Sequence, residues 1–563
     1  MKKLYFTLIA MLFATATYAQ ELSANDRTFS NAEQLFTLTG NRPNCHSMRT
    51  TLKFGKSTCT ATATAKQRAT AANNTPTLIT KQPKGTLYKD LYGFARGFYV
   101  FYGTAYYDLT DGVTKDVVID NDNNFYIKDP ISNVSFNTWI KGHKAQGDTI
   151  EVQLPQAINK VTDEDTGESA YMYLYKMVLD QQNSTYVPDK SSQIMKFVWR
   201  NDSLIKVDDD LLGLALEDGS WQGYGDDVIT MNVMKLKPEA PQNPNAAENY
   251  QMHYDISIDK DDRVVKVAIE GNNFYLGNLS KECPSNWAKG HIEGNKVIFD
   301  AYSYMGIDST NRAHTFLVPA GYKDIYYEYI NQHQDSIFFR DKVIFDYDAA
   351  NKTLTTDSGF VVNRGIDDIK VIAKYFSPTL KPWTETVGAP LDPVFTAFEP
   401  YDKKYGYGSF SYQLSKYDSE GHLLNPDKLY YNVYFDDEKI TFYPDEYKMI
   451  PNDMTDVPYS YIDSWDFYMN GITRKLYFYC TGLEKVGLQS FYLDGDKKYA
   501  SKLVFFDANA TGIHPSATVN SPVKSISYTD LSGRKVKRPA KGIYIKTTVY
   551  ANGTVQSAKF IAQ

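Results

Sequence analysis

Two acidic stretches contain the residue types of a calcium loop. Asp163, Asp165 and Glu168 lie within "DEDTGE", and Asp418 and Glu420 lie within "DSEG". Calcium binds carboxylate and carbonyl oxygens that a tight turn brings together. Neither stretch has the full loop spacing or the distal bidentate glutamate of an EF-hand, so an ordinary solvated turn is the alternative for each. Calcium is the one cofactor that the sequence suggests.

Aromatic side chains beside turn residues could bind a sugar. Trp221 and Tyr224 lie in "DGSWQGYGD", and Trp465 and Tyr468 lie in "DSWDFYMNG". An aromatic face can pack on the C–H face of a pyranose, and binding residues concentrate at loop tips. These four residues are therefore predicted to bind a ligand, which we expect to be a glycan or a cell-surface protein.

A catalytic set is not recognisable in the sequence. There is no Gly-x-Ser-x-Gly elbow and no His-Glu-x-x-His motif, and the eight histidines are scattered singly. The acids at 207–211 and 225–228 are adjacent, so on a strand they would point to opposite faces and not across a cleft. We expect a non-catalytic binding protein. A secreted polysaccharide hydrolase and a purely structural envelope protein are the alternatives.

Composition indicates the fold class. The chain of 563 residues contains 45 tyrosines and 30 phenylalanines, which favour pleated, half-buried strands in several all-β domains. The net charge is −7, and the acidic residues concentrate between basic ends, which argues against a nucleic-acid partner. After the first residues no apolar run is long enough to span a membrane.

One sequence pattern occurs twice. "NNFYIKDPISNVSFNTWIKG" at 123–142 and "NNFYLGNLSKECPSNWAKG" at 272–290 both end in Trp-x-Lys-Gly. Trp139 precedes Trp199 by sixty residues, and Trp287 precedes Tyr347 by the same distance. The repeat predicts two tandem antiparallel domains at 81–235 and 250–373, each a β-sandwich or a barrel-like sheet. Both repeated tryptophans are interpreted as core residues.

The segments around the repeat differ in composition. Residues 20–80 contain few large apolar side chains and are predicted to be a mostly disordered linker, in which Cys45 and Cys59 could form a local disulfide or remain thiols. Proline-rich stretches at 236–249 and 377–393 are interpreted as linkers. Residues 394–510 alternate aromatic and polar side chains and resemble a fibronectin type III-like sandwich.

The two ends indicate export. Residues 1–19 combine two lysines, an apolar run and a small-residue site before Gln20, which is typical of a secretory signal peptide. Residues 522–563 contain "DLSGRKV" and "KGIYI" and resemble the C-terminal sorting domain of the type IX, or Por, secretion system. That resemblance implies a small β-module, the export machinery as a partner, and a location outside the cell or on its outer surface, reached through the periplasm.

The body of the chain carries a second resemblance. The stretches "KQPKGTLYKDLYG" and "LNPDKLYYNVYFDDE", together with the two Trp-x-Lys-Gly units, are similar to uncharacterised tyrosine-rich secreted proteins of the Bacteroidales. The resemblance implies a secreted β-protein and does not imply an activity.

Overall fold

The fold is all-β, as predicted. The computed structural model describes residues 52–53, 76–101, 104–132, 134–162, 169–180, 182, 185–256, 259–327, 332–447, 449–463, 466–507, 523–530, 535–536, 542–550 and 555–562. Within these ranges the only helical segments are two short 3-10 turns, η3 (Pro244–Ala246) and η4 (Pro426–Lys428). The predicted signal peptide, Cys45 and Cys59 lie outside the described residues.

The first barrel is a closed antiparallel sheet. Eight of its strands pair in the cyclic order β2-β3-β4-β5-β6-β10-β11-β13 and back to β2, while β12, β8, β7 and β9 extend the sheet outward from β13, and β1 adds to β3. The bounds are β1 (Leu52–Lys53), β2 (Thr86–Phe101), β3 (Thr104–Ile119), β4 (Asn124–Lys128), β5 (Trp139–Lys144), β6 (Thr149–Gln153), β7 (Gln156–Thr162), β8 (Ser169–Asp180), β9 (Thr185–Pro188), β10 (Ile194–Arg200), β11 (Ser203–Lys206), β12 (Leu211–Leu216) and β13 (Trp221–Asn232).

The second barrel repeats this strand order. Its closed ring is β14-β15-β16-β17-β18-β22-β23-β25 and back to β14, and β24, β20, β19 and β21 form the same outward extension. The bounds are β14 (Glu248–Ile256), β15 (Asp259–Glu270), β16 (Asn273–Gly277), β17 (Trp287–Glu293), β18 (Lys296–Asp300), β19 (Ser303–Ile307), β20 (His314–Tyr327), β21 (Gln332–Phe339), β22 (Lys342–Asp348), β23 (Thr353–Thr355), β24 (Gly359–Arg364) and β25 (Val371–Pro382).

Side chains at equivalent positions form part of the core inside each barrel, which confirms the predicted internal repeat. Trp139 and Trp287 begin the equivalent strands β5 and β17, and only 4% and 7% of their surfaces are exposed. The sixty-residue spacing places Trp199 5.9 Å from Phe125 in one barrel. In the other barrel, Tyr347 lies 6.3 Å from Phe274 in the same arrangement. Each pair packs on its barrel's core, so the repeated sequence marks core positions.

The ends of the barrels differ from the predicted boundaries. Ile79, within the predicted linker, forms a bridge with Trp139. At the other end β25 extends to Pro382, beyond the predicted boundary at residue 373, and pairs with β14 to close the second barrel. The prolines had suggested a linker here. Pro378 lies at a register shift and Pro382 at the end of the strand. At such positions a proline, which lacks a backbone N–H, does not interrupt the hydrogen bonds between the strands.

The third unit is a β-sandwich. Its first sheet has the order β26-β27-β32-β31, and its second has β29-β28-β33 with β34 and β35 both pairing with β33. These orders correspond to the A-B-E-D and C′-C-F-G sheets of the immunoglobulin-like architecture, which fibronectin type III domains share. The bounds are β26 (Val394–Asp402), β27 (Tyr407–Gln413), β28 (Leu429–Phe435), β29 (Glu438–Lys439), β30 (Val457–Pro458), β31 (Phe467–Asn470), β32 (Thr473–Phe478), β33 (Lys485–Asp494), β34 (Lys497–Ala500) and β35 (Val504–Asp507).

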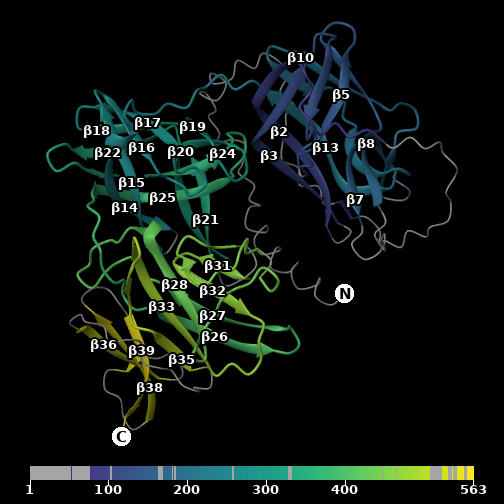
Figure 1. Cartoon of the computed structure of the whole chain (residues 1–563). Coiled ribbons are helices and arrows are strands. Elements are labelled where there is room, and N and C mark those ends of the chain that lie inside the picture. The colour runs from purple at the N-terminus through teal and green to yellow at the C-terminus, as the bar shows by residue number, and fades with distance from the viewer. Residues whose placement is uncertain are drawn as a thin grey trace.

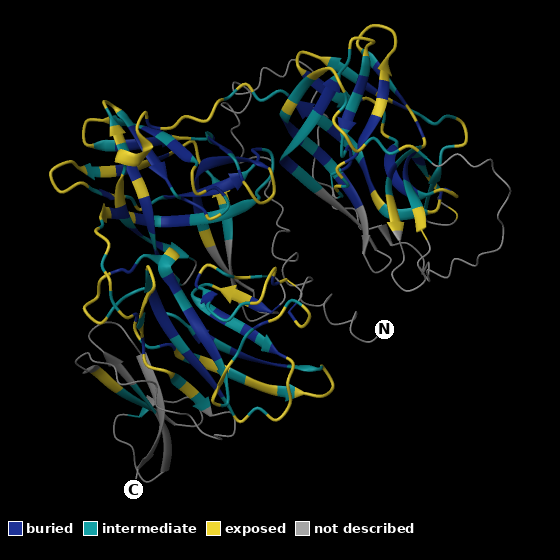
Figure 2. Cartoon of the chain, in the orientation of Figure 1, coloured by how far each residue is buried: buried dark blue, intermediate teal, exposed yellow. Residues whose placement is uncertain are grey.

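A small C-terminal sheet follows the sandwich. Its strands have the order β37-β36-β38-β39, with bounds β36 (Val523–Asp530), β37 (Lys535–Val536), β38 (Gly542–Tyr550) and β39 (Val555–Ala562). Figure 1 shows the first barrel, the second barrel, the sandwich and this module in chain order. Figure 2 shows the buried residues gathered inside each barrel and between the sheets of the sandwich.

A buried carboxyl joins the two barrels. Asp111, on β3, accepts a hydrogen bond from the hydroxyl of Tyr92 and two more from the backbone N–H groups of Asp367 (2.5 Å) and Asp368 (3.1 Å) in the second barrel. Gly365 allows this approach because its φ is +70° and because a Cβ there would collide with the Asp111 carboxylate. The barrels therefore share polar contacts that centre on a carboxyl only 3% exposed.

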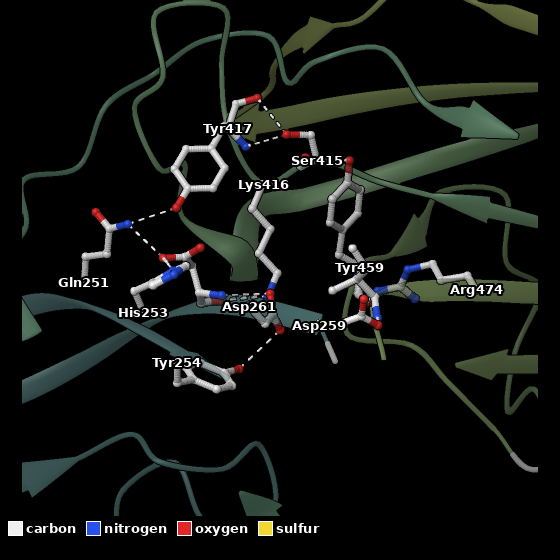
Figure 3. Close-up of polar contacts among 12 residues, drawn as sticks. Gln251, His253, Tyr254, Asp259, Asp261, Ser415, Lys416, Tyr417, Tyr459 and Arg474 are labelled. Carbon is white, nitrogen blue, oxygen red and sulfur yellow. Dashed lines mark hydrogen bonds and ion pairs between the residues drawn. The ribbon is translucent and has the colours of Figure 1, made fainter. Parts of the chain in front are cut away.

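The second barrel also contacts the sandwich, through the β14–β15 hairpin (Figure 3). Lys416 donates to Asp261 Oδ1 at 2.6 Å and to the carbonyl of Asp262 at 2.8 Å. Gln251 bridges the units, since it donates to Asp262 Oδ1 at 2.9 Å and to the Tyr417 hydroxyl at 3.0 Å. These bonds, several of them to charged groups, hold the sandwich against the second barrel. The turn end of the sandwich's β26–β27 hairpin extends away from the second barrel (Figure 1).

Candidate functional site

The outer face of the β26-β27-β32-β31 sheet combines tyrosines with a charged pair. Alternation along β27 and β32 buries Phe410, Tyr412, Leu476 and Phe478 in the sandwich core, so the intervening side chains face outward. We use the name tyrosine face for the outward residues Tyr405, Tyr407, Tyr468, Tyr477, Glu399 and Lys475. Tyr405 belongs to the turn that joins β26 to β27.

The rings of the tyrosine face lie close together. The centroids of Tyr407 and Tyr477 are 5.3 Å apart, and those of Tyr405 and Tyr407 are 6.2 Å apart. Tyr468 lies directly opposite Lys475 in the β31–β32 ladder, so it belongs to the same face. Tyr468 is 46% exposed and Tyr405 is 41% exposed. A ligand can therefore reach several aromatic rings from one side of the sheet.

A concavity opens at the hairpin end of this face. Its volume is about 530 Å³, and its lining includes Glu399, Tyr401, Asp402, Tyr405 and Tyr407. The turn at its rim is held by the backbone of Asp402, whose carbonyl accepts hydrogen bonds from the N–H groups of Tyr405 (3.1 Å) and Gly406 (2.7 Å). This volume is in the range of small-molecule binding sites, and its lining is aromatic with a few polar groups.

A charged pair occupies the centre of the face. Lys475 donates to Glu399 Oε2 at 3.0 Å, and the hydroxyl of Ser409 donates to the same oxygen at 2.6 Å. The Ser409 bond, and then the ammonium of Lys475, hold the pKa of Glu399 below its usual range against partial burial. Partial burial is the largest single influence on Lys475 and opposes its charge, but the bond to Glu399 and the interactions with Tyr477 together outweigh it, and the pKa of Lys475 is raised. Both groups are therefore charged at neutral pH.

The loop before β31 fixes the direction of Tyr468. Asp463 Oδ1 accepts hydrogen bonds from the backbone N–H groups of Asp466 (2.7 Å) and Phe467 (3.0 Å), which holds the chain as it enters the strand. Phe467 is then buried in the core, so Tyr468 must face outward. Trp465, predicted as a ligand platform in the same loop, lies outside the described residues.

The other two predicted platform residues lie in the first barrel. Trp221 is half-buried, and its ring lies 5.6 Å from Phe98 and 5.1 Å from Tyr186. Its indole N–H donates to the carbonyl of Tyr224 at 3.3 Å, and Tyr224 itself is 39% exposed. Trp221 thus supports an aromatic cluster at the edge of the barrel, and it does not share a site with Tyr468.

The structure describes only one of the two candidate calcium stretches. Asp163, Asp165 and Glu168 lie outside the described residues. Asp418 is engaged in its own turn, because its Oδ1 accepts from the N–H groups of Glu420 and His422 at 2.9 Å each, and its Oδ2 lies 3.2 Å from His422 Nδ1. In the part of the chain that the structure describes, no three His, Cys, Asp or Glu side chains are grouped to hold a metal ion.

Sequence reasoning missed most of the tyrosine face. The signal was present, since Tyr407, Ser409 and Ser411 alternate with buried residues, as do Lys475 and Tyr477. The alternation did not reveal that β32 pairs with β27, which is what brings these residues together.

No protein-family model, curated protein or solved structure matches this chain. Within the described ranges, no helix is long and apolar enough to cross a bilayer.

Proposed function

We propose that this chain is an exported, non-catalytic binding protein that holds a glycan on the tyrosine face. The observation that carries the proposal is the arrangement of Tyr407, Tyr468 and Tyr477 around the Glu399–Lys475 pair on one outward face. Aromatic rings supply apolar contact area to the C–H face of a sugar, and the charged pair supplies hydrogen bonds for its hydroxyls. A protein ligand is the alternative occupant of this face.

The charge state of the site favours binding over hydrolysis. A glycoside hydrolase needs one carboxyl group held protonated as an acid and a second held as a base or nucleophile. Ser409 and Lys475 keep Glu399 ionised, so Glu399 does not fit the role of the protonated acid. The sandwich therefore has the groups for recognition on this face, and we propose no reaction there.

Removing single rings tests the proposal. Tyr477→Ala and Tyr468→Ala are each expected to weaken binding by about tenfold, because one aromatic contact contributes up to about 1.5 kcal/mol. A glycan array would identify the ligand and isothermal titration would measure the loss. Tyr443→Ala, which removes an exposed tyrosine outside the face, is the matched control and should bind as wild type. Failure of the wild type to bind any glycan would contradict the proposal, as would release of sugar from a polysaccharide panel.

Export is the second part of the proposal and rests on the two ends of the sequence. The mature protein is expected to begin at Gln20, since the small-residue site precedes it. The 522–563 module, which resembles a type IX sorting domain, is proposed to contact the export machinery and to bring the protein to the outer surface. N-terminal sequencing of the exported protein checks the cleavage site, and retention of Met1 would contradict it.

A further inference from the structure

The side chains at the centre of the tyrosine face are small. The middle strand β27 contributes Ser409 and Ser411 there, opposite Glu399 on β26 and Lys475 on β32. Because these serines are small, the longer Glu399 and Lys475 side chains meet above them, with Oε2 and Nζ 3.0 Å apart. The acceptor and the donor thus lie side by side at the surface. Lys475 Nζ lies over the ring of Tyr477, and Tyr468 is the ladder partner of Lys475 on the next strand.

Hydrogen-bonding capacity remains on both members of the pair. The bonds that Glu399 accepts from the described residues, those of Ser409 and Lys475, both end on Oε2. Its Oε1 accepts none of these bonds, and the side chain is 61% exposed. An ammonium has three donors, and Lys475 interacts with Glu399 and with the Tyr477 side chain, which leaves one donor. A ligand that donates to Glu399 and accepts from Lys475 would therefore fit without displacing either.

Two neighbouring hydroxyls of a pyranose have this pattern. One hydroxyl donates to a carboxylate while the adjacent one accepts from an ammonium, and hydrogen bonds to ionised groups are the stronger kind. Lys475 Nζ lies over the ring of Tyr477, 5.1 Å from its centroid, so a sugar hydrogen-bonded to Lys475 is next to that aromatic ring. The distances on the face thus suit a sugar that is stacked and hydrogen-bonded at once.

The charges of the face disfavour an acidic sugar. Glu399 is paired with Lys475, and the adjoining concavity is lined by Asp402 and Lys403, so neither place carries an uncompensated positive charge. A uronate or sulfate placed at Lys475 would face Glu399 at short range, and residues 394–507 contain more acidic than basic residues.

We infer that the Glu399–Lys475 pair recognises a vicinal diol of a neutral sugar, so that the ligand of the tyrosine face is a neutral polysaccharide. The inference rests on the proposed function of this face and adds the class of ligand and the two residues that determine it. Lys475 is the donor to one hydroxyl, and Glu399 is both the acceptor from its neighbour and the group that excludes acidic sugars.

The test is a titration with two sets of probes. The neutral set contains cello-, xylo-, manno- and malto-oligosaccharides, and the acidic set contains oligosaccharides of polygalacturonate and alginate. Wild type is expected to bind a member of the neutral set and to lose that binding when the probe's vicinal diols have been cleaved by periodate. Glu399→Gln and Lys475→Gln are each expected to weaken neutral binding by about tenfold. Glu399→Gln should also shift the preference toward the acidic set, because Lys475 then lacks its counter-charge.

Controls separate this inference from the proposed function. Glu438→Gln on β29, in the opposite sheet, should bind as wild type, and thermal melting shows whether each variant remains folded. If Tyr477→Ala loses binding while Glu399→Gln and Lys475→Gln do not, the diol inference is wrong and the glycan-binding face stands. Stronger binding of the acidic set by wild type also overturns the inference. If wild type binds neither set, the inference fails, and if the glycan array is negative as well, the proposed function fails with it.

Discussion

Replacing Asp111 by alanine is expected to destabilise the two-barrel unit by about 3 to 5 kcal/mol, the range for a buried group whose partners are left uncompensated. The carboxyl accepts from the Tyr92 hydroxyl and from two backbone N–H groups, those of Asp367 and Asp368. Alanine removes this acceptor from all three donors at once. Tyr92 also accepts from the N–H of Ile366 at 2.9 Å, so its own position depends on Asp111.

Denaturant unfolding of the full chain measures this loss. Asp122→Ala is the matched control, because Asp122 is an exposed acid in a turn of the same barrel and should change stability by about 0.5 kcal/mol or less. An additional unfolding transition in Asp111→Ala that is absent from wild type would indicate that the barrels have uncoupled. A decrease below about 1 kcal/mol would contradict the argument, since it would mean that water satisfies the three donors.

The repeat explains how much of the fold could be predicted. Trp139 and Trp287 recur at one spacing because both begin equivalent strands and both are buried, so the duplication was visible in the sequence. Closure into a barrel was not visible. It depends on β2 pairing with β13 and β14 pairing with β25, strands more than a hundred residues apart, and alternation shows which face is buried without showing which edges meet.

The candidate site was partly predictable for the same reason. Tyr468 was identified from the turn residues around it, and the structure places it on the tyrosine face. Glu399, Tyr407 and Tyr477 come from three strands whose neighbours are set by the sandwich topology, so their sequence positions carried no sign that they meet. Trp221 had the same turn signal as Tyr468, but its ring packs against Phe98 in the barrel.

Two buried groups between the barrels should respond to pH with opposite signs. Burial, followed by the charge of Asp367, raises the pKa of Asp111 to about 7, although its hydrogen-bond donors oppose the shift. Burial lowers the pKa of His314 to about 4, although its bond to the Asp90 carbonyl opposes that shift. The Tyr304 hydroxyl lies 2.8 Å from Nδ1 and Nε2 lies 3.0 Å from the Asp90 oxygen, an arrangement that a neutral imidazole satisfies.

The signs follow from which state binds the proton. Asp111 has a higher pKa in the folded state than its unfolded value of about 3.9, so its contribution to stability is full at low pH and is lost as pH rises toward 7. His314 has a lower pKa in the folded state than its unfolded value of about 6.5, so its contribution is full above that pH and is lost as pH falls toward 4. Between about pH 4 and 6.5 the two slopes oppose each other. The wild-type interface is therefore expected to change little over this range.

Replacing Asp111 by asparagine should expose the dependence of His314. The amide keeps an acceptor for the backbone N–H groups of Asp367 and Asp368 and removes the titrating carboxyl. Relative to wild type, the free energy of unfolding of Asp111→Asn should fall by about 3 kcal/mol as the pH is lowered from 6.5 to 4, because wild type is stabilised over this range by the protonation of folded Asp111, which the variant lacks. Urea unfolding of both proteins at a series of pH values measures the difference, in which the other titrating groups cancel.

His314→Gln should show the opposite trend and lose stability relative to Asp111→Asn as the pH rises from 4 toward 7, since Asp111 alone then titrates. Parallel curves for wild type and Asp111→Asn would show that the proton on Asp111 does not offset the desolvation of His314.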